Sequence, residues 1–273
     1  MTNNLLLIAI KASIKAGIAI IDIYENHDFH VDFKSDNSPL TIADKKGHNI
    51  IFDMLSGLEL PILSEEGIIH DYNTRKHWGK YWCIDPLDGT KEFIKRNGEF
   101  TVNIALIDKN TPVAGVIYVP VTKELYFSST EIGAFKIDDV SKIDFNNLDL
   151  DPLIKSSQKL PIIRKRDVFT IVASRSHLNE ETKTFINKMT ERFGKVETIS
   201  IGSSLKLCMV AEGLADIYPR FAPTMEWDTA AGTAIVLNAG FELTKDDGIT
   251  PLDYNKKNLL NPNFIVKPRR FEV

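Results

Sequence analysis

The chain has 273 residues, 43% of them hydrophobic and 26% charged, which is the composition of an ordinary globular protein with room for one large domain or two smaller ones. Its formal net charge of −4 argues against a nucleic-acid-binding surface, because such surfaces normally carry a basic excess. No nucleic-acid partner is therefore expected.

The N-terminus is apolar, but it does not have the pattern of a targeting or spanning segment. Residues 1–10 lack a basic leader, and Lys11 and Lys15 interrupt the apolar run that continues beyond them. Isoleucines near helical spacing predict instead an amphipathic helix over residues 2–25. We expect no integral membrane segment and a cytoplasmic location.

The rest of the first half mixes helix and strand. A second helix is predicted over 41–56, with Thr41 as its N-cap and Asp44 three residues later, an arrangement similar to a capping box. Residues 68–79 are polar and predict a loop. Period-two or short apolar runs predict strands at 60–63, 81–84, 100–107, 112–119, 124–127 and 133–136.

The second half alternates strand and helix, which is typical of an α/β domain. The polar residues 137–167 show little periodicity, so we place a boundary there, between an N-terminal α+β metal-binding domain (1–150) and a C-terminal α/β substrate domain (151–273). Strands are predicted at 168–173, 196–199, 215–218, 241–243 and 264–266, and helices after Asn179, after Gly202 and from Met225.

The two cysteines, Cys83 and Cys208, lie in apolar surroundings. Buried free thiols in a reducing compartment are the expected state, with a disulfide as the unsupported alternative.

The segment Asp85 to Thr90, Asp-Pro-Leu-Asp-Gly-Thr, is the strongest functional pattern. Pro86 predicts that the preceding strand stops at Asp85. The carboxylates of Asp85 and Asp88 repel each other unless a cation or a proton lies between them, and Mg²⁺ is the usual cation for oxygen ligands. Gly89 allows close approach of a ligand, and a short helix from Thr90 would favour an anion. A metal beside an anion predicts phosphate chemistry.

Three further acids are candidate members of this site. Glu65, like Asp85, ends a strand, so it approaches the pair if the two strands are neighbours; a solvated turn is the alternative. Asp228 begins an apolar helix, where an acid also complements the helix dipole. Asp44 is a candidate to orient the Thr90 hydroxyl, and its role as a helix cap is equally consistent with the local sequence.

Three basic side chains are candidate phosphate or ligand contacts. Lys206 lies on the helix after Gly202, Arg220 ends an apolar strand and His177 follows another. Ligands of α/β sheets collect at the carboxyl ends of strands, and this shared position makes a functional role as plausible as a surface one.

These residues carry a family resemblance. Asp85 to Thr90 together with Trp227-Asp-Thr-Ala-Ala-Gly232 resembles the two signatures of the inositol monophosphatase superfamily of Mg²⁺-dependent, lithium-sensitive phosphatases. Longer runs are similar to the bacterial 3'(2'),5'-bisphosphate nucleotidase branch; they lie at 85–94, 97–106, 202–206, 215–220 and 225–228. The implied fold is α/β (α+β), a layered αβαβα sandwich.

The resemblance also implies roles for individual residues. The implied metal ligands are Glu65, Asp85, Asp88, Asp228 and the backbone carbonyl of Leu87. They would hold two or three Mg²⁺ ions, and Li⁺ would inhibit the enzyme. Asp44, Glu65 and Thr90 are the implied catalytic residues. The implied substrate contacts are Glu65, Leu87, Asp88, Gly89, Thr90, His177, Ser203, Lys206, Arg220 and Asp228.

The implied activity is hydrolysis of the 3'-phosphate of adenosine 3',5'-bisphosphate (PAP) to AMP, with the sulfated nucleotide PAPS as a second substrate in sulfur assimilation. An inositol monophosphatase or a fructose-1,6-bisphosphatase of the same superfamily is the alternative, and a non-catalytic nucleotide-binding regulator is the alternative from another class. Monomer or homodimer stays open, as does peripheral attachment to the cytoplasmic face of the inner membrane, which is found in some relatives.

Overall fold

A seven-stranded sheet organises the first half of the chain. β3 (Ile62–Ser64) runs parallel to β4 (Lys80–Asp88), and every later neighbour in this sheet is antiparallel. The remaining strands follow in sequence order: β5 (Thr101–Asp108), β6 (Thr111–Val119), β7 (Glu124–Ser129), β8 (Gly133–Ile137) and β9 (Gln158–Lys159). The computed structural model describes residues 2–26, 31–33, 39–144, 147–174 and 179–272.

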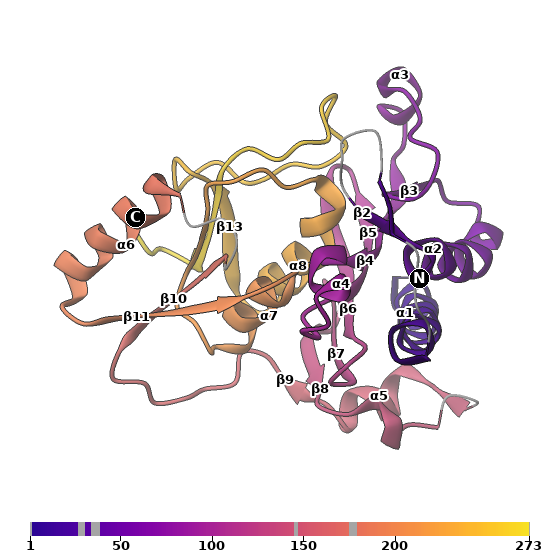
Figure 1. Ribbon diagram of the computed structural model, residues 1–273, viewed down its shortest axis with the longest axis horizontal. Helices are drawn as coiled ribbons and strands as arrows, with labels where there is room; N and C mark the ends of the chain where they lie inside the picture. The colour runs from indigo at the N-terminus through magenta and orange to yellow at the C-terminus, as the bar shows by residue number, and fades with distance from the viewer. Residues whose placement is uncertain (1, 27–30, 34–38, 145–146, 175–178, 273) are drawn as a thin grey trace.

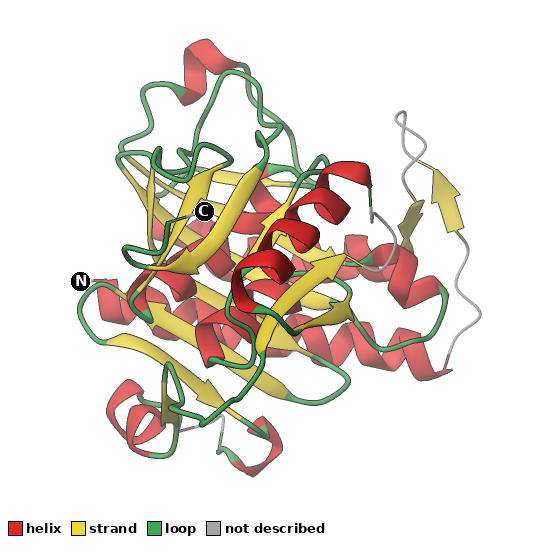
Figure 2. Ribbon diagram, turned by 90° about the vertical axis from the view of Figure 1, so that its left-hand side faces the viewer, coloured by secondary structure: helices red, strands yellow, loops and turns green. Residues whose placement is uncertain are grey.

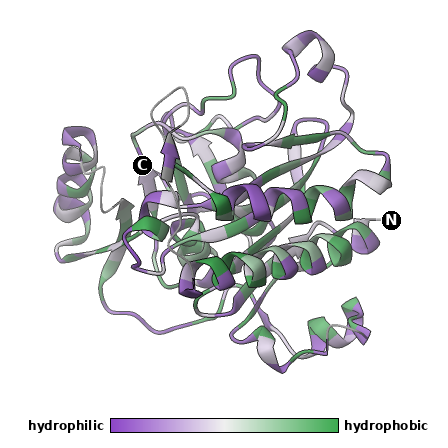
Figure 3. Ribbon diagram, turned by 45° about the vertical axis from the view of Figure 1, so that its right-hand side comes forward, coloured by the Kyte–Doolittle hydropathy of each residue, from purple (hydrophilic) through white to green (hydrophobic). Residues whose placement is uncertain are grey.

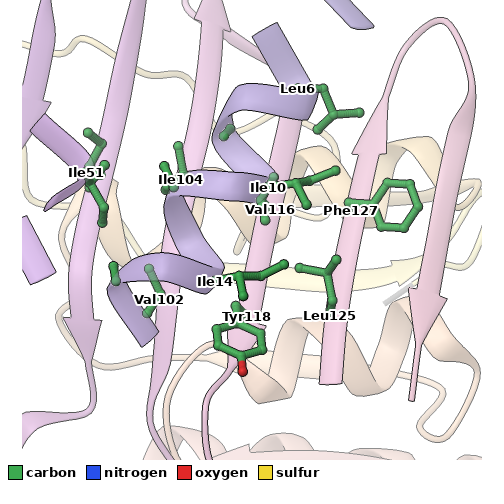
Figure 4. Close-up of a cluster of buried hydrophobic side chains, with 14 of the residues drawn as sticks. Leu6, Ile10, Ile14, Ile51, Val102, Ile104, Val116, Tyr118, Leu125 and Phe127 are labelled. Carbon is green, nitrogen blue, oxygen red and sulfur yellow. The ribbon is translucent and has the colours of Figure 1, made fainter. Parts of the chain in front are cut away.

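Helices cover both faces of this sheet. α1 (Thr2–Asn26) and α2 (Ile42–Leu55) pack on one face, and α8 (Glu226–Asn238) packs on the other beside α7 (Leu205–Glu212). Side chains alternate across a strand, so Trp82 joins the core under α1 whereas Cys83 joins the core under α8. Figure 4 shows the first of these cores, where Ile10 and Ile14 of α1 meet Val116 and Leu125 of the sheet.

A second sheet lies beyond α7 and α8. β12 (Tyr218–Arg220), β14 (Phe264–Pro268) and β13 (Phe241–Lys245) form one part of it, in that order, and β10 (Phe169–Ser174) with β11 (Val196–Ile201) forms a parallel pair. A parallel bridge between Ile171 and Ile217 joins the two parts.

The outermost layer is α6 (Glu180–Phe193), which begins after its N-cap Asn179 and packs on β10, β11 and β12. The layers therefore run helix, sheet, helix, sheet, helix, with α6 at one end and α1 and α2 at the other (Figures 1 and 2). The outer helices mix hydrophilic and hydrophobic residues, as one-sided packing requires (Figure 3). This arrangement confirms the expected layered αβαβα sandwich.

Several shorter elements complete the described chain. They are β1 (Val31–Phe33), β2 (Pro39–Thr41), η1 (Ser56–Leu58), α3 (Tyr72–Arg75), α4 (Thr90–Ile94), η2 (Val140–Lys142) and α5 (Leu150–Lys155).

Most predicted elements are confirmed within a few residues, but some predictions were wrong. β4 does not stop at Asp85: it continues to Asp88 across a register shift between these two residues, and Pro86 sits where the ladder is interrupted. β12 begins at Tyr218, later than predicted, since Ile217 contributes only the bridge. The segment 68–79, expected to be loop, contains the single turn α3.

The division at residue 150 stays a prediction. β9 follows this position and still pairs with β8 of the large sheet. Both cysteines are buried and free, as expected. Within the described residues, no helix has both the length and the hydrophobicity needed to cross a membrane.

Candidate active site

The predicted acids meet where β3 and β4 end. Because the two strands are parallel, with Ser64 opposite Ile84, Glu65 leaves the sheet beside Asp85, and its backbone N–H donates to the carbonyl of Ile84 at 3.2 Å. The Glu65 carboxyl group lies near enough to Asp85 to raise the pKa of that carboxyl. The expected neighbourhood of these strands is thus confirmed.

Asp85 and Asp228 lie in one electrostatic environment with the other two acids. Burial raises the pKa of Asp85 well above its ordinary value, and the charges of Glu65, Asp88 and Asp228 raise it further. Burial likewise raises the pKa of Asp228, with further increases from Asp88 and Glu65 and a partial offset from Arg220. Four acids from three separate segments are therefore close enough to influence one another's ionisation.

Three of these acids accept hydrogen bonds from the protein through one of their carboxylate oxygens. Asp85 accepts from the backbone N–H of Leu87 through Oδ1 at 3.0 Å, and Asp228 accepts from the backbone N–H of Met225 through Oδ2 at 2.8 Å. Asp88 accepts from two serine hydroxyls through Oδ2. Within the part of the chain that the structure describes, these bonds orient each carboxylate through one of its two oxygens.

The donor set fits a hard divalent cation chemically, since it consists of carboxylate oxygens that repel one another without a counter-charge. Among the described residues, however, no group of three or more His, Cys, Asp or Glu side chains already has the spacing of a formed metal site. The acids are gathered, but bringing them to ligand spacing requires their side chains to move closer together around an ion.

Asp44 contacts both Thr41 and Thr90. Its Oδ2 completes the capping box of α2 by accepting from the backbone N–H of Thr41 at 2.7 Å, and its Oδ1 accepts from the Thr90 hydroxyl at 3.0 Å. The same Thr90 hydroxyl lies 3.3 Å from the carbonyl oxygen of Leu87. Burial is the main cause that raises the pKa of Asp44.

Gly89 makes the turn between Asp88 and Thr90. It adopts φ 99°, in the left-handed region, and a Cβ at this position would lie 2.9 Å from the carbonyl oxygen of Glu99. A glycine is therefore required for both the conformation and the space, and the turn starts α4 directly after Asp88.

A cavity of about 140 Å³ opens beside the acids. Its lining includes Asp88 and Asp228 on the acidic side and Lys206 and Arg220 on the basic side. Burial lowers the pKa of Lys206 to about 8 despite the raising effect of Asp88. An anion in this cavity would meet two cationic side chains next to the acid cluster.

Both cations also bond to backbone carbonyls. Lys206 Nζ donates to Ser203 O at 2.6 Å and to Ile201 O at 3.2 Å, and Arg220 donates to Ala222 O at 3.1 Å and to Pro223 O at 3.0 Å. The structure thus brings Ser203, Lys206 and Arg220 to the cavity with the acids, whereas the predicted contact His177 lies outside the described residues.

Sequence reasoning missed three polar residues beside Asp88, namely Thr101, Asn103 and Ser204. Thr101 and Asn103 of β5 are buried, and Asn103 Nδ2 donates to Ser204 Oγ at 2.9 Å. The available signal for the two β5 residues was the alternation Thr-Val-Asn-Ile, which puts two polar side chains on one face of an otherwise apolar strand.

The model of the inositol monophosphatase family matches residues 1–272. The chain belongs to the inositol monophosphatase family. This membership confirms the resemblance seen in the sequence.

Individual relatives within the inositol monophosphatase family match over nearly the whole chain. The 3'(2'),5'-bisphosphate nucleotidase CysQ of Shigella flexneri is 45% identical over 255 residues, which span 92% of this chain and 94% of that protein. The crystal structure of CysQ from Bacteroides thetaiotaomicron superposes with a TM-score of 0.91 at 52% identity and covers 98% of both chains. The extragenic suppressor protein suhB from Bartonella henselae has a TM-score of 0.74 at 27% identity, over 97% of this chain and 94% of that one.

Proposed function

We propose that the protein is a Mg²⁺-dependent 3'(2'),5'-bisphosphate nucleotidase that hydrolyses the 3'-phosphate of PAP, giving AMP and phosphate. The observation that carries this proposal is the shared cavity, whose lining holds Asp88 and Asp228 as well as Lys206 and Arg220. A metal-bound phosphate ester suits this cavity, because the acids can bind the metal ion and the two basic side chains can bind the phosphate. The CysQ relatives, which match over nine-tenths of the chain, support the nucleotide as the substrate.

Glu65, Asp85, Asp88, Asp228 and the carbonyl of Leu87 are the groups that would hold two or three Mg²⁺ ions. When bound, Mg²⁺ supplies the positive charge that lowers the pKa of the attacking water and neutralises the phosphate and the leaving 3'-oxygen. No covalent phosphoenzyme is needed, because water attacks phosphorus directly.

The residues around the attacking water have separate tasks. Thr90 donates its single proton to Asp44, which leaves a lone pair on Thr90 Oγ to accept a hydrogen bond from that water. The raised pKa of Asp44 strengthens it as an acceptor. Glu65, beside Asp85 at the strand end, is the second acceptor for the water's protons.

Lys206 and Arg220 bind the rest of the substrate in this proposal. With a pKa of about 8, Lys206 keeps its positive charge near neutral pH, and a nucleotide with two phosphates offers one anion to Lys206 and another to the Arg220 guanidinium. PAPS carries the same 3'-phosphate, so we propose it as a second substrate, which would place the enzyme in sulfur assimilation.

The deciding experiment measures phosphate release from PAP, inositol 1-phosphate and fructose 1,6-bisphosphate, each with Mg²⁺ alone and with added Li⁺. PAP is expected to have the highest kcat/KM, with no turnover in EDTA and inhibition by Li⁺. Faster turnover of inositol 1-phosphate or fructose 1,6-bisphosphate would replace the substrate assignment. Nucleotide binding without phosphate release from any ester would indicate a non-catalytic regulator.

A further inference from the structure

The hydroxyl groups of two adjacent serines, far from Asp88 in the sequence, meet on one oxygen of its carboxylate. Ser203 Oγ donates to Asp88 Oδ2 at 2.8 Å and Ser204 Oγ lies 2.7 Å from the same oxygen. Asn103 Nδ2 is a third, longer contact at 3.4 Å. Every hydrogen bond that the described residues give to this carboxylate ends on Oδ2, so Oδ1 is left for another partner.

A buried network supports these hydroxyls from behind. Thr101 Oγ lies 2.7 Å from Ser203 Oγ and 2.9 Å from Asn103 Oδ1, and Asn103 in turn donates to Ser204. Thr101, Asn103 and Ser204 are each at most 3% exposed. A satisfied polar network in a dry environment holds its members in one arrangement.

Ser204 also connects Asp88 to Asp228. Its hydroxyl lies 2.7 Å from Asp88 Oδ2 and 2.7 Å from the backbone carbonyl of Asp228, and Asn103 occupies one of its lone pairs as a donor. With one proton and two acceptors, this hydroxyl sets the spacing between two of the predicted metal ligands.

The backbone at Ser203 is strained in a way that its hydroxyl explains. Ser203 has φ 55°, in the left-handed region that favours glycine. The Lys206 ammonium group holds this conformation by donating to the carbonyl of Ser203 at 2.6 Å. Glycine would fit this backbone more easily but could not donate to Asp88, so strain is maintained where a functional contact depends on it.

We propose that Ser203 and Ser204 are positioning residues that clamp Oδ2 of Asp88 and thereby present Oδ1 to the metal. The clamp makes metal affinity depend on the contact between β5 in the first half of the chain and the turn before α7 in the second. This role rests on the proposed function, and it reassigns Ser203 from a contact of the nucleotide to a support of the metal site.

The test measures metal affinity without nucleotide, so that it does not depend on turnover. Mn²⁺ binding is followed by the loss of the free-ion electron paramagnetic resonance signal, and Mg²⁺ binding by competition against Mn²⁺. The variants are Ser204→Ala and Ser203→Gly. Ser128→Ala is the matched control, because Ser128 is also buried and also bonds across the two halves, accepting from Asn238 Nδ2 at 3.2 Å, but away from Asp88.

Ser204→Ala and Ser203→Gly are each expected to weaken metal binding by about tenfold, the usual effect of losing a residue that orients a ligand. Ser128→Ala should retain the wild-type affinity. Ser203→Gly removes the hydroxyl while relieving the left-handed strain, so its urea-unfolding midpoint should stay close to that of the wild type. A loss of metal affinity without a loss of stability is the result that a merely structural serine would not produce.

Wild-type metal affinity in a folded Ser203→Gly protein would overturn the proposal, and this variant serves if Ser204→Ala does not fold. A raised KM for PAP with unchanged Mn²⁺ affinity would also overturn it, because that result assigns the hydroxyls to the substrate. These failures leave the proposed function intact when wild-type protein still hydrolyses PAP. Absence of hydrolysis by wild-type protein that binds Mn²⁺ would instead remove the proposed function.

Discussion

At the scale of single residues, a carboxylate has two oxygens and can therefore serve two partners. Asp44 caps α2 with one oxygen and accepts from Thr90 with the other, and Asp228 caps α8 with one oxygen while lining the cavity. The sequence left open whether Asp44 is a helix cap or a site residue, and its two oxygens allow it to be both.

Thr90→Val tests the hydroxyl alone, because valine keeps the shape and removes the donor. The rate of phosphate release from PAP is expected to fall about 100-fold or more, while the free energy of unfolding changes by less than about 1 kcal/mol. Steady-state kinetics and urea unfolding check both halves of the prediction. Thr190→Val, which removes a hydroxyl that donates to Ile186 O within α6, is the control that should keep full activity. A Thr90→Val enzyme with wild-type kcat would remove Thr90 from the mechanism.

Asp85→Asn is expected to stabilise the metal-free protein while abolishing activity. Burial and the neighbouring acids raise the folded-state pKa of Asp85, so the unfolded chain loses this proton first as the pH rises. Folding stability is therefore lost above the ordinary pKa of an aspartate and continues to fall until the folded group also ionises. Asparagine has no such dependence and still offers Oδ1 to the N–H of Leu87.

Urea unfolding in EDTA at about pH 5 and about pH 8 measures this effect. The stability gain of Asp85→Asn should be on the order of 1 kcal/mol and larger at the higher pH. Removing a repelled, buried charge from an active site commonly raises stability and lowers activity. Added Mg²⁺ should stabilise the wild type more than the variant, because only the wild type retains the full ligand charge. If Asp85→Asn and the wild type had the same free energy of unfolding at both pH values, the neighbouring acids would not be raising the pKa of Asp85.

At the scale of elements, the position of α8 depends on small residues. α8 is buried on nearly all sides, with Ala231 and Ala234 close to the large sheet and Gly232 facing Leu207 of α7. Gly115 of β6 lies beneath it: a Cβ there would lie 2.9 Å from the Cβ of Ala234 and would overlap the carbonyl oxygen of Ala231. Because Asp228 stands in the first turn of α8, this packing also sets the depth of one acid.

Gly115→Ala is expected to cost about 3 kcal/mol, because a helix backbone cannot yield as a flexible side chain can. The displaced α8 should also carry Asp228 away from the other acids and weaken Mn²⁺ binding. Urea unfolding and Mn²⁺ titration test the two effects. Gly57→Ala is the control, since among the described residues, its chain neighbours apart, no atom would lie within 4 Å of a Cβ at that position, and it should be neutral or slightly stabilising. A Gly115→Ala protein as stable as the wild type would show that the sheet and helix can separate freely.

At the scale of the whole molecule, a buried ion-pair network fastens the two halves of the chain away from the site. Glu212 at the end of α7 is 3% exposed and lies 3.1 Å from Lys136 Nζ, 2.7 Å from Arg164 Nη2 and 2.8 Å from the hydroxyl of Tyr126. Burial alone would lower the pKa of Lys136, but the hydrogen bonds and charges of Glu124 and Glu212 outweigh burial and raise it.

Glu212→Gln should lower the free energy of unfolding by about 2 kcal/mol, because it removes one charged partner from the buried Lys136, which keeps Glu124, and from Arg164. A lysine with a raised folded-state pKa contributes its stability fully below the unfolded pKa, so this cost should be the same at about pH 6 and about pH 8. Metal affinity should be unchanged. The exposed pair Lys183–Glu180 offers the control Glu180→Gln, with an expected cost below about 0.5 kcal/mol. A comparable cost for both variants would contradict the role of burial.

The sequence by itself determined the local features of this protein, because they depend on residues close together in the chain. Helical and strand periods predicted most elements, Thr41 and Asp44 predicted the cap of α2, and the segment from Thr90 predicted the short helix α4. The motif at Asp85 to Thr90, with its resemblance, predicted the family and the layered fold. The strand end at Asp85 was wrong, since a bulge let β4 pass Pro86.

Only the tertiary structure decided which distant residues share a space. The parallel pairing of β3 with β4 brings Glu65 to Asp85, and the contact of β5 with the turn before α7 brings Thr101 and Asn103 to the serines around Asp88. The contacts of β5 with this turn close a loop of about a hundred residues, and no local propensity encodes which polar side chains will meet across it. Hydrogen bonds among buried groups select that arrangement, because a polar group left unpaired in the core is costly. The identity of the acids was thus readable from the chain, whereas the network that orients Asp88 became visible only in the fold.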